Sequence, residues 1–174
     1  DDSMWLIDLV ENLLSVTRIE EGRMQIRQSA ELVDEVIKEA LKHTGQSRTG
    51  RTIKVEEEDE LILAKMDARL IVQVLINLIK NAKESCGQNT APQIEVELEQ
   101  VPGKVCSLTV RDNGEGILPE VIDKVFVPFF TTKPSGSGIG LSLCKQIMNL
   151  HGGTITVSSE IGKGSCFTLM FPGR

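Results

Sequence analysis

The residues best suited to chemistry stand in the second half of the chain, where a strand-like stretch ends in a carboxylate followed by glycines. After residues 105–111 come Asp112, Gly114, Gly116 and Ile117. A carboxylate at a strand exit can accept a hydrogen bond from an exocyclic amine, as in adenine, and glycine lets the backbone turn or approach a flat ligand. Because this short pattern also describes many turns, it predicts a purine site only together with other signals.

A second glycine group lies downstream and precedes a helical pattern. Its members are Gly136, Ser137, Gly138, Ile139, Gly140 and Leu141. Free N–H groups and the helix dipole at such a position attract anions, phosphate above all. The group lacks the third glycine of the dinucleotide fingerprint and the Gly-Lys-Ser/Thr of a P-loop. We therefore expect a phosphate-binding helix start of another kind.

Two amides stand on a helix that is otherwise apolar nearly all round. Asn77 and Asn81 extend the stripe begun by Leu70 and Val74, at a spacing that places both side chains on one face. Buried amides need hydrogen-bond partners. An isolated pair of this kind would most simply bond to backbone groups. With two glycine groups downstream, a ligand-binding role is the better interpretation.

The segment from residue 125 to Gly138 has no periodicity and is rich in Phe, Pro, Gly and Ser. A long irregular segment in a compact domain is usually functional, and here it predicts a lid over a ligand. Its candidate ligand-binding members are Phe126, Phe130, Thr131, Thr132 and Lys133. Each Phe could equally belong to the core. Lys133 is the best-placed cation for phosphate, with a solvated lysine as the alternative.

The elements that must position these residues follow from apolar periodicity. Helices are predicted at residues 3–21, 30–43, 67–85, 119–124 and 139–150. Strands are predicted at residues 24–28, 52–55, 61–66, 93–100, 105–111, 154–158 and 165–171. Asp67 stands at the N-cap position of its helix. The acidic run 56–60 indicates a solvated hairpin turn rather than a metal site, because one turn cannot converge five neighbouring carboxylates on one ion.

Composition excludes several classes of protein. The chain has 174 residues, 40% hydrophobic, enough for one sizeable core, and its net charge of −6 argues against a nucleic-acid surface. No apolar run approaches the roughly 18–20 residues of a membrane span, and nothing resembles a signal peptide. Four widely spaced cysteines indicate small core residues in a reducing cytoplasm, and two histidines form no usual zinc pattern.

The order of these motifs resembles the ATP-binding domain of sensor histidine kinases, within the wider family of gyrase-type and Hsp90-type ATPases. The corresponding boxes are Asn77–Asn81 (N), Asp112–Gly116 (G1), Phe126–Phe130 (F), Gly136–Gly140 (G2) and the third glycine motif Gly162–Gly164. This resemblance covers residues 3 to 172. It implies an α/β two-layer sandwich, in which a mixed five-stranded sheet packs on three helices and one dimerisation-type helix precedes them.

The resemblance also implies cofactors, ATP and Mg²⁺, and roles for residues. Asn81 would coordinate Mg²⁺ bridging the phosphates, and Asn77 and Lys133 would act at the transferred phosphoryl group. Thr168, expected to share an inward face with Cys166 and Met170, would help Asp112 to hold adenine. Glu84 is expected at the same nucleotide site, at a position where related kinases often have a lysine. The lysine that contacts phosphate is therefore left open between residues 80, 83 and 133.

The first helix resembles the end of a dimerisation hairpin. Residues 13–22 match the close of its second helix, so the first helix, with the phosphoacceptor histidine, is expected before residue 1. We therefore predict two units, residues 1–22 from the hairpin and residues 23–174 as the ATP-binding domain. The expected partners are a response regulator receiver domain and a second copy bound through residues 3–21. The expected location is cytoplasmic.

Three functions remain open from the sequence. The first is the ATP-binding catalytic domain of a protein-histidine kinase. The second is a gyrase-like or Hsp90-like ATPase, which the resemblance disfavours because those enzymes place a water-activating glutamate where this chain has Asn77. The third is a non-catalytic nucleotide-binding or dimerisation module. His43 and His151 lie outside any helical hairpin and are poor candidates for a phosphoacceptor.

Overall fold

The structure is a computed structural model that describes residues 2–20, 22, 25–44, 53–87, 91–130 and 140–172, with the side chains of residues 2–6, 8, 9 and 20 left aside. Helices occupy α1 (Asp2–Glu20), α2 (Val33–His43), α3 (Ala68–Ser85) and α4 (Gly140–Leu150), with a 3₁₀ turn η1 (Ile122–Lys124). Strands occupy β1 (Ser29–Leu32), β2 (Ile53–Glu57), β3 (Leu63–Met66), β4 (Ile94–Glu99), β5 (Lys104–Asp112), β6 (Thr154–Glu160) and β7 (Gly164–Pro172).

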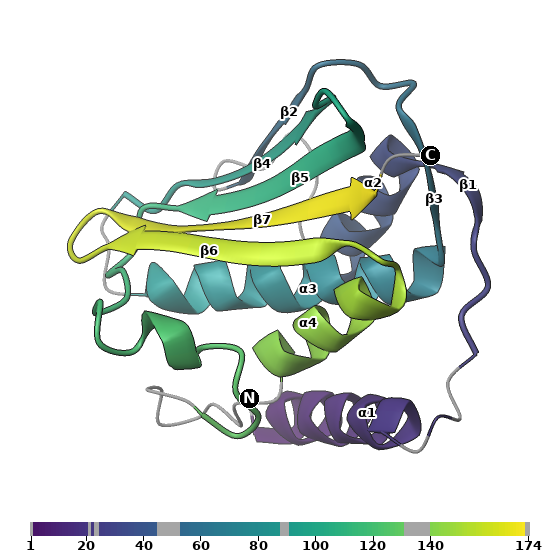
Figure 1. The fold of residues 1–174 in the computed structure, drawn as a ribbon. Helices are drawn as coiled ribbons and strands as arrows, with labels where there is room; N and C mark the ends of the chain where they lie inside the picture. The colour runs from purple at the N-terminus through teal and green to yellow at the C-terminus, as the bar shows by residue number, and fades with distance from the viewer. Residues whose placement is uncertain are drawn as a thin grey trace.

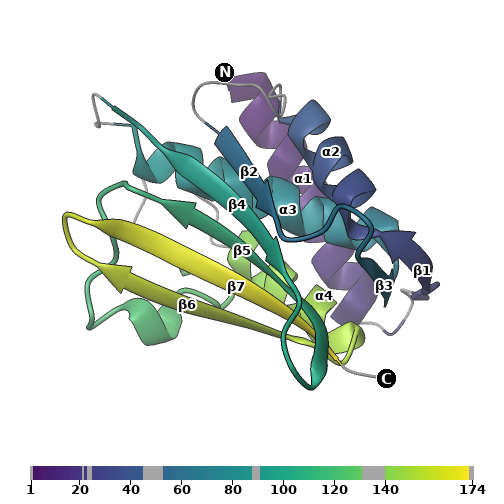
Figure 2. The same cartoon turned by 90° about the horizontal axis from the view of Figure 1, so that it is seen from above.

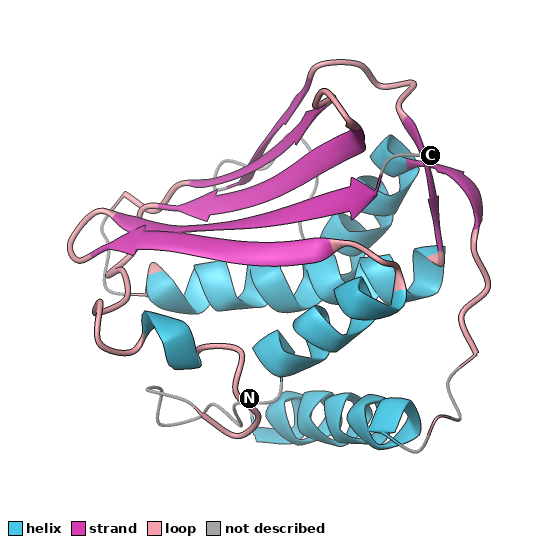
Figure 3. Ribbon diagram, in the orientation of Figure 1, coloured by secondary structure: helices cyan, strands magenta, loops and turns pink. Residues whose placement is uncertain are grey.

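The main sheet has five strands in the order β2-β4-β5-β7-β6, and α2, α3 and α4 lie against one face of it (Figures 1 and 2). Strand β2 runs parallel to β4, and the other neighbours are antiparallel. The predicted mixed five-stranded sheet on three helices, with one helix preceding them, is confirmed. Figure 3 shows the same two layers as magenta strands above cyan helices.

The predicted hairpin at residues 52–66 is wrong. Strand β2 pairs with β4, so that Ile53 lies opposite Ile94, whereas β3 pairs antiparallel with β1 in a separate two-stranded sheet. Parallel pairing of β2 with β4 is favoured because it places the apolar side chains of both strands side by side on the helix-covered face. The strand predicted at residues 24–28 also lies too early, since residues 25–28 are irregular and β1 begins at Ser29.

The core fills the space between the sheet and the helices. Alternate strand residues point inward and are fully buried, among them Ile94, Val96, Leu98, Leu108, Val110, Phe167, Leu169 and Phe171. Helix α3 meets them with a wide apolar surface: Leu70, Ile71, Val74, Leu75, Leu78, Ile79 and Ala82 are all buried. A helix that is apolar on most sides must lie in the interior, and α3 is accordingly the central helix of the layer.

Helix α1 lies beneath α4, on the far side of the helical layer from the sheet (Figure 1). Val16 is buried and Ile19 packs against the core. The opposite side of α1 exposes Ile7, Val10, Leu13 and Leu14, each between 42% and 51% accessible. One side of α1 thus contacts the domain while another apolar side stays uncovered.

Among the helices that the structure describes, none is both long enough and apolar enough to cross a membrane.

Candidate functional site

Asp112 ends β5 on the inward face of the sheet, at the edge of the core. Its side chain is only 5% exposed and points to the same face of the strand as Leu108 and Val110. One carboxylate oxygen accepts a hydrogen bond from the backbone N–H of Gly114 at 2.9 Å. The turn beyond the strand therefore fixes the orientation of this buried carboxylate, as its predicted role in base recognition requires.

Glycines let this turn fit between the end of α3 and the β6–β7 hairpin. A Cβ on Gly114 would overlap the Ser85 carbonyl, and one on Gly116, where φ is +79°, would overlap the Glu160 carbonyl. The adjoining Glu115 donates its N–H to the Ser85 carbonyl at 3.1 Å. In the described structure, the close approach that these glycines permit is therefore to the protein's own backbone.

The third glycine motif packs against the backbone of Asp112 from the neighbouring strand. Gly164 has φ of +122°, and a Cβ there would overlap the Asp112 carbonyl. The next residue, Ser165, lies directly opposite Asp112 across the β5–β7 pair and is 3% exposed. The hydroxyl oxygens of Ser165 and Ser159 lie 2.9 Å apart. Ser159 Oγ also accepts a hydrogen bond from the N–H of Ile117 at 2.7 Å.

Thr168 does not lie at this site, which corrects the prediction that it shares an inward face with Cys166 and Met170. Side chains alternate along β7, and Phe167, Leu169 and Phe171 take the inward positions. Thr168 lies opposite Thr109 on the outer face, with 3.4 Å between the two hydroxyl oxygens. Ser165 is the hydroxyl that sequence reasoning missed. Because β7 has apolar side chains at both parities, the sequence alone carries no signal that separates Ser165 from Thr168.

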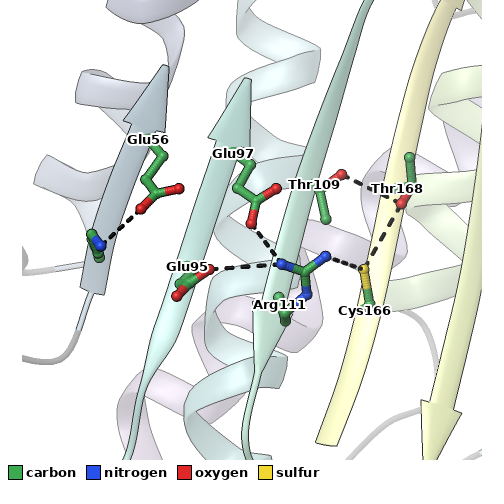
Figure 4. A network of polar contacts seen from close by, with 8 residues as sticks. Glu56, Glu95, Glu97, Thr109, Arg111, Cys166 and Thr168 are labelled. Atoms are coloured by element: carbon green, nitrogen blue, oxygen red, sulfur yellow. Dashed lines mark hydrogen bonds and ion pairs between the residues drawn. The ribbon is translucent and has the colours of Figure 1, made fainter. Parts of the chain in front are cut away.

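The outer face of the sheet carries a charged network (Figure 4). Arg111 contacts Glu97 at 2.6 Å and Glu95 at 3.7 Å, and Lys54 contacts Glu56 at 2.7 Å. The three carboxylates are close enough together to hold a cation. Arg111 already pairs with two of these carboxylates and Lys54 with the third, so a network of salt bridges explains the cluster. It lies on the opposite face from Asp112.

Asn77 and Asn81 lie on α3 as predicted, one turn apart and half-buried. Asn77 Nδ2 donates to the carbonyl of Gly140, the first residue of α4, at 3.4 Å. The N-box amide therefore touches the residue at which the second glycine group becomes a helix. The first turn of α4, with its free N–H groups, therefore begins beside Asn77.

Burial shifts the pKa of a titratable side chain on each of α3 and α4. Cys144, one turn into α4, points its thiol at the Val74 carbonyl at 3.7 Å, and burial raises its pKa to about 12, so it stays neutral. Lys83 donates to the Thr44 carbonyl at 2.9 Å, and burial, then Lys80, lower its pKa. Lys83 therefore binds the backbone at the end of α2. Glu84 is exposed, on the same side of α3 as the amide pair.

The F-box aromatics have different surroundings. Phe126 is half-buried, edge-on to Phe167 with 6.2 Å between ring centroids, and Lys145 Nζ lies 5.4 Å from its ring centre. Phe130 is half-buried, whereas Phe129 is 67% exposed with φ of +68°. Leu141 is also half-buried and packs on the core. The predicted ligand residues Thr131, Thr132, Lys133, Gly136, Ser137, Gly138 and Ile139 lie outside the described residues.

Asp67 has another role than the predicted side-chain cap. It stands at the N-cap position of α3 but makes no capping bond. Its carboxylate instead accepts the N–H of Arg27 at 3.1 Å and the guanidinium of Arg69 at 3.0 Å. Burial opposes the charge of Asp67, yet these two donors outweigh it and hold its pKa below the ordinary value. The backbone N–H of Asp67 donates to His151 Nε2 at 3.0 Å.

An open α/β sandwich with a buried aspartate at a strand end and an amide pair on its central helix defines the class of ATP-binding domains that have an N box and glycine boxes. The sequence profile of the histidine kinase-, DNA gyrase B- and HSP90-like ATPases matches residues 66–174. The solved catalytic domain of histidine kinase ThkA is 32% identical, with a TM-score of 0.73, over 84% of this chain and 95% of that structure. This chain therefore belongs to that ATPase family, among its histidine kinase catalytic domains.

Two further comparisons extend over nearly the whole chain. The sensor protein KdpD of Clostridium acetobutylicum is 34% identical over 99% of this chain, which spans 19% of the length of KdpD. A structure of ThkA in complex with the response regulator protein TrrA is 28% identical, with a TM-score of 0.74, over 97% of this chain and 49% of ThkA.

Proposed function

We propose that this chain is the ATP-binding catalytic domain of a protein-histidine kinase, which holds the γ-phosphate of Mg·ATP for attack by an imidazole on another helix. The contact that carries the proposal is the one between Asn77 and Gly140. It brings the N-box amides to the start of α4, in a family of ATP-binding domains. Transfer to an imidazole needs positioning and charge neutralisation more than a built-in base, because the imidazole is itself the nucleophile.

In this proposal each box has one task. Asp112 accepts the exocyclic amine of adenine, with Gly114, Gly116 and Ile117 shaping the turn around it. The start of α4, with residues 136–139, binds the phosphates through backbone N–H groups. Phe126, Phe130, Thr131, Thr132 and Lys133 line the nucleotide as a lid, and Lys133 adds positive charge.

Asn81 fits a magnesium ion by the chemistry of its donor. It offers an uncharged, hard amide oxygen from a half-buried helical position, and Mg²⁺ typically takes few protein ligands besides water and phosphate oxygens. Mg²⁺ would neutralise charge on the phosphates when bound. Asn77 would support the same site, with its NH₂ group held by Gly140.

Hydrolysis is the weaker alternative. A water-activating base would have to stand on the buried stripe of α3, where this chain has Asn77. Glu84 is exposed at the far end of the same helix. Both observations favour transfer to a histidine over release of phosphate to water.

The histidines of the described chain are unsuited to accept the phosphoryl group. His151 is 5% exposed, and its two ring nitrogens contact the Asp67 N–H and the Ile147 carbonyl, at 3.0 Å and 2.8 Å. His43 is the last residue of α2 and contacts Glu39 at 3.1 Å. The acceptor we propose is a histidine on a helix paired with α1.

The wider assembly follows from the same proposal. Residues 1–22 would belong to a dimerisation hairpin and residues 23–174 to the ATP-binding domain. The exposed Ile7, Val10, Leu13 and Leu14 would then pair with a second helix or a second copy. The complex of ThkA with TrrA supports a response regulator as the recipient of the phosphoryl group. We place the domain in the cytoplasm, where ATP and such regulators meet.

A nucleotide titration with and without Mg²⁺ tests the proposal. The parent should bind ATP more tightly with Mg²⁺, and Asn81→Ala should lose that gain while keeping adenosine binding. Asn149→Ala, an exposed amide on α4, is the matched control and should behave as the parent. Equal strengthening by Mg²⁺ in parent and Asn81→Ala would refute the metal assignment, and no ATP binding by the folded parent would refute the proposed function.

A further inference from the structure

Helix α1 presents a buried amide to the ATP-binding domain. Asn12 is 8% exposed and, among the side chains of α1 that the structure describes, is the only polar one that is buried. It shares a face of the helix with Val16 and Ile19, which pack on the domain. A buried amide must find polar partners to be tolerated.

Those partners belong to the N-box helix and to the start of α4. Asn12 Oδ1 accepts a hydrogen bond from Gln73 Nε2 at 3.3 Å. Asn12 Nδ2 lies 3.9 Å from the position that a Cβ would take on Gly140. Gly140 is the residue whose carbonyl holds the Asn77 amide.

The contacts form a continuous row along α3. Gln73, Asn77 and Asn81 follow one another at intervals of four residues and so share one helix face. Asn12 thus touches the first amide of a row whose second and third members we assign to the nucleotide. It also packs against the residue that fixes the second amide.

We propose that Asn12 is a positioning residue of the nucleotide site, acting from outside the ATP-binding domain through Gln73 and Gly140. This inference rests on the proposed function, because it needs Asn77 and Asn81 to serve the phosphates. With α1 docked, Gln73 and the first turn of α4 are braced, and Asn77 keeps its bond to the Gly140 carbonyl. An amide whose NH₂ group is held has a fixed direction for its oxygen, which favours ligand binding by preorganisation.

The same geometry links nucleotide binding to the position of α1. If docking of α1 strengthens binding of Mg·ATP, then Mg·ATP strengthens docking of α1 by the same factor. Among the α1 side chains that the structure describes, the docked face includes the buried Val16, the half-buried Ile19 and the Asn12 amide bonded to Gln73.

The test compares Asn12→Leu with Glu11→Ala, a substitution at an exposed neighbour on α1. Leucine removes the acceptor for Gln73 at similar size. We expect Asn12→Leu to bind Mg·ATP about three- to tenfold more weakly by calorimetry, the factor that loss of one hydrogen bond produces. Adenosine affinity should change less than about twofold, because adenine is held by Asp112 at the other end of the site.

Glu11→Ala should bind Mg·ATP within about twofold of the parent. Gln73→Leu removes the bond from the other side and should weaken Mg·ATP as Asn12→Leu does. The inference is overturned if Asn12→Leu, folded by circular dichroism, binds Mg·ATP as the parent does. It is also overturned if adenosine and Mg·ATP weaken equally. Failure of the parent itself to bind Mg·ATP would instead refute the proposed function.

Discussion

Substituting alanine at Gly116 tests how tightly the turn that carries Asp112 is packed. The residue has φ of +79°, and a Cβ there would lie 2.8 Å from the carbonyl carbon of Glu160 and 3.0 Å from Cα of Ile161. A non-glycine residue in the left-handed region costs about 1–2 kcal/mol. Forcing an extra carbon into a packed site costs about a further 1–3 kcal/mol. We therefore expect Gly116→Ala to lower the free energy of unfolding by about 2–5 kcal/mol.

Gly162→Ala is the matched control. Gly162 has nearly the same backbone conformation, with φ of +81°, but nothing lies within 4 Å of the position of a Cβ. Its substitution should cost about 1–2 kcal/mol, from the backbone alone. Urea denaturation followed by circular dichroism measures both variants. Equal losses in the two would refute the conclusion that Gly116 is required by close packing against the β6–β7 hairpin.

Three further outcomes are expected. Asp112→Asn should keep its circular dichroism spectrum but lose ATP and ADP together, because both present the same adenine amine; undiminished binding would remove the assignment of Asp112. Incubated alone with labelled ATP, the chain should retain no stable phosphate, and acid-labile label found on His43 or His151 by mass spectrometry would contradict this. The folded pKa of Asp67 is lowered, so its contribution to stability is present above the unfolded value of about 4 and is lost as pH falls through the lower folded value. Asp67→Asn should therefore flatten the acid side of the stability curve, and an unchanged slope would mean that Asp67 contributes little to it.

Local periodicity was sufficient to predict the parts of the fold that depend on nearby residues. The apolar surface of α3 and the spacing of Asn77 and Asn81 are properties of one helix, and the structure places both amides on one face as expected. The alternation of β4 likewise predicted its inward side chains, which are all buried.

What periodicity missed depends on residues far apart in the chain. Strand β7 has apolar side chains at both parities, so only packing against the helices shows that Phe167 points inward and Thr168 outward. Strand β2 pairs with β4 rather than with β3, a choice made by tertiary contacts. The partners of Gly114 and Gly116, the ends of α3 and β6, likewise follow from tertiary packing.

The bond between the Arg27 N–H and the Asp67 carboxylate gives the chain a fixed point shortly after α1 ends at Glu20. From this point, α1 is held to its docking face by a short tether, so its local concentration at α3 and α4 is far higher than that of a free helix. Lengthening the tether lowers this concentration only slowly, by about 0.6 kcal/mol for each doubling of its length. Loss of the Asp67 carboxylate would therefore lengthen the tether and lower the local concentration of α1 at its docking face. Docking would weaken gradually, and the contact surface itself would stay intact.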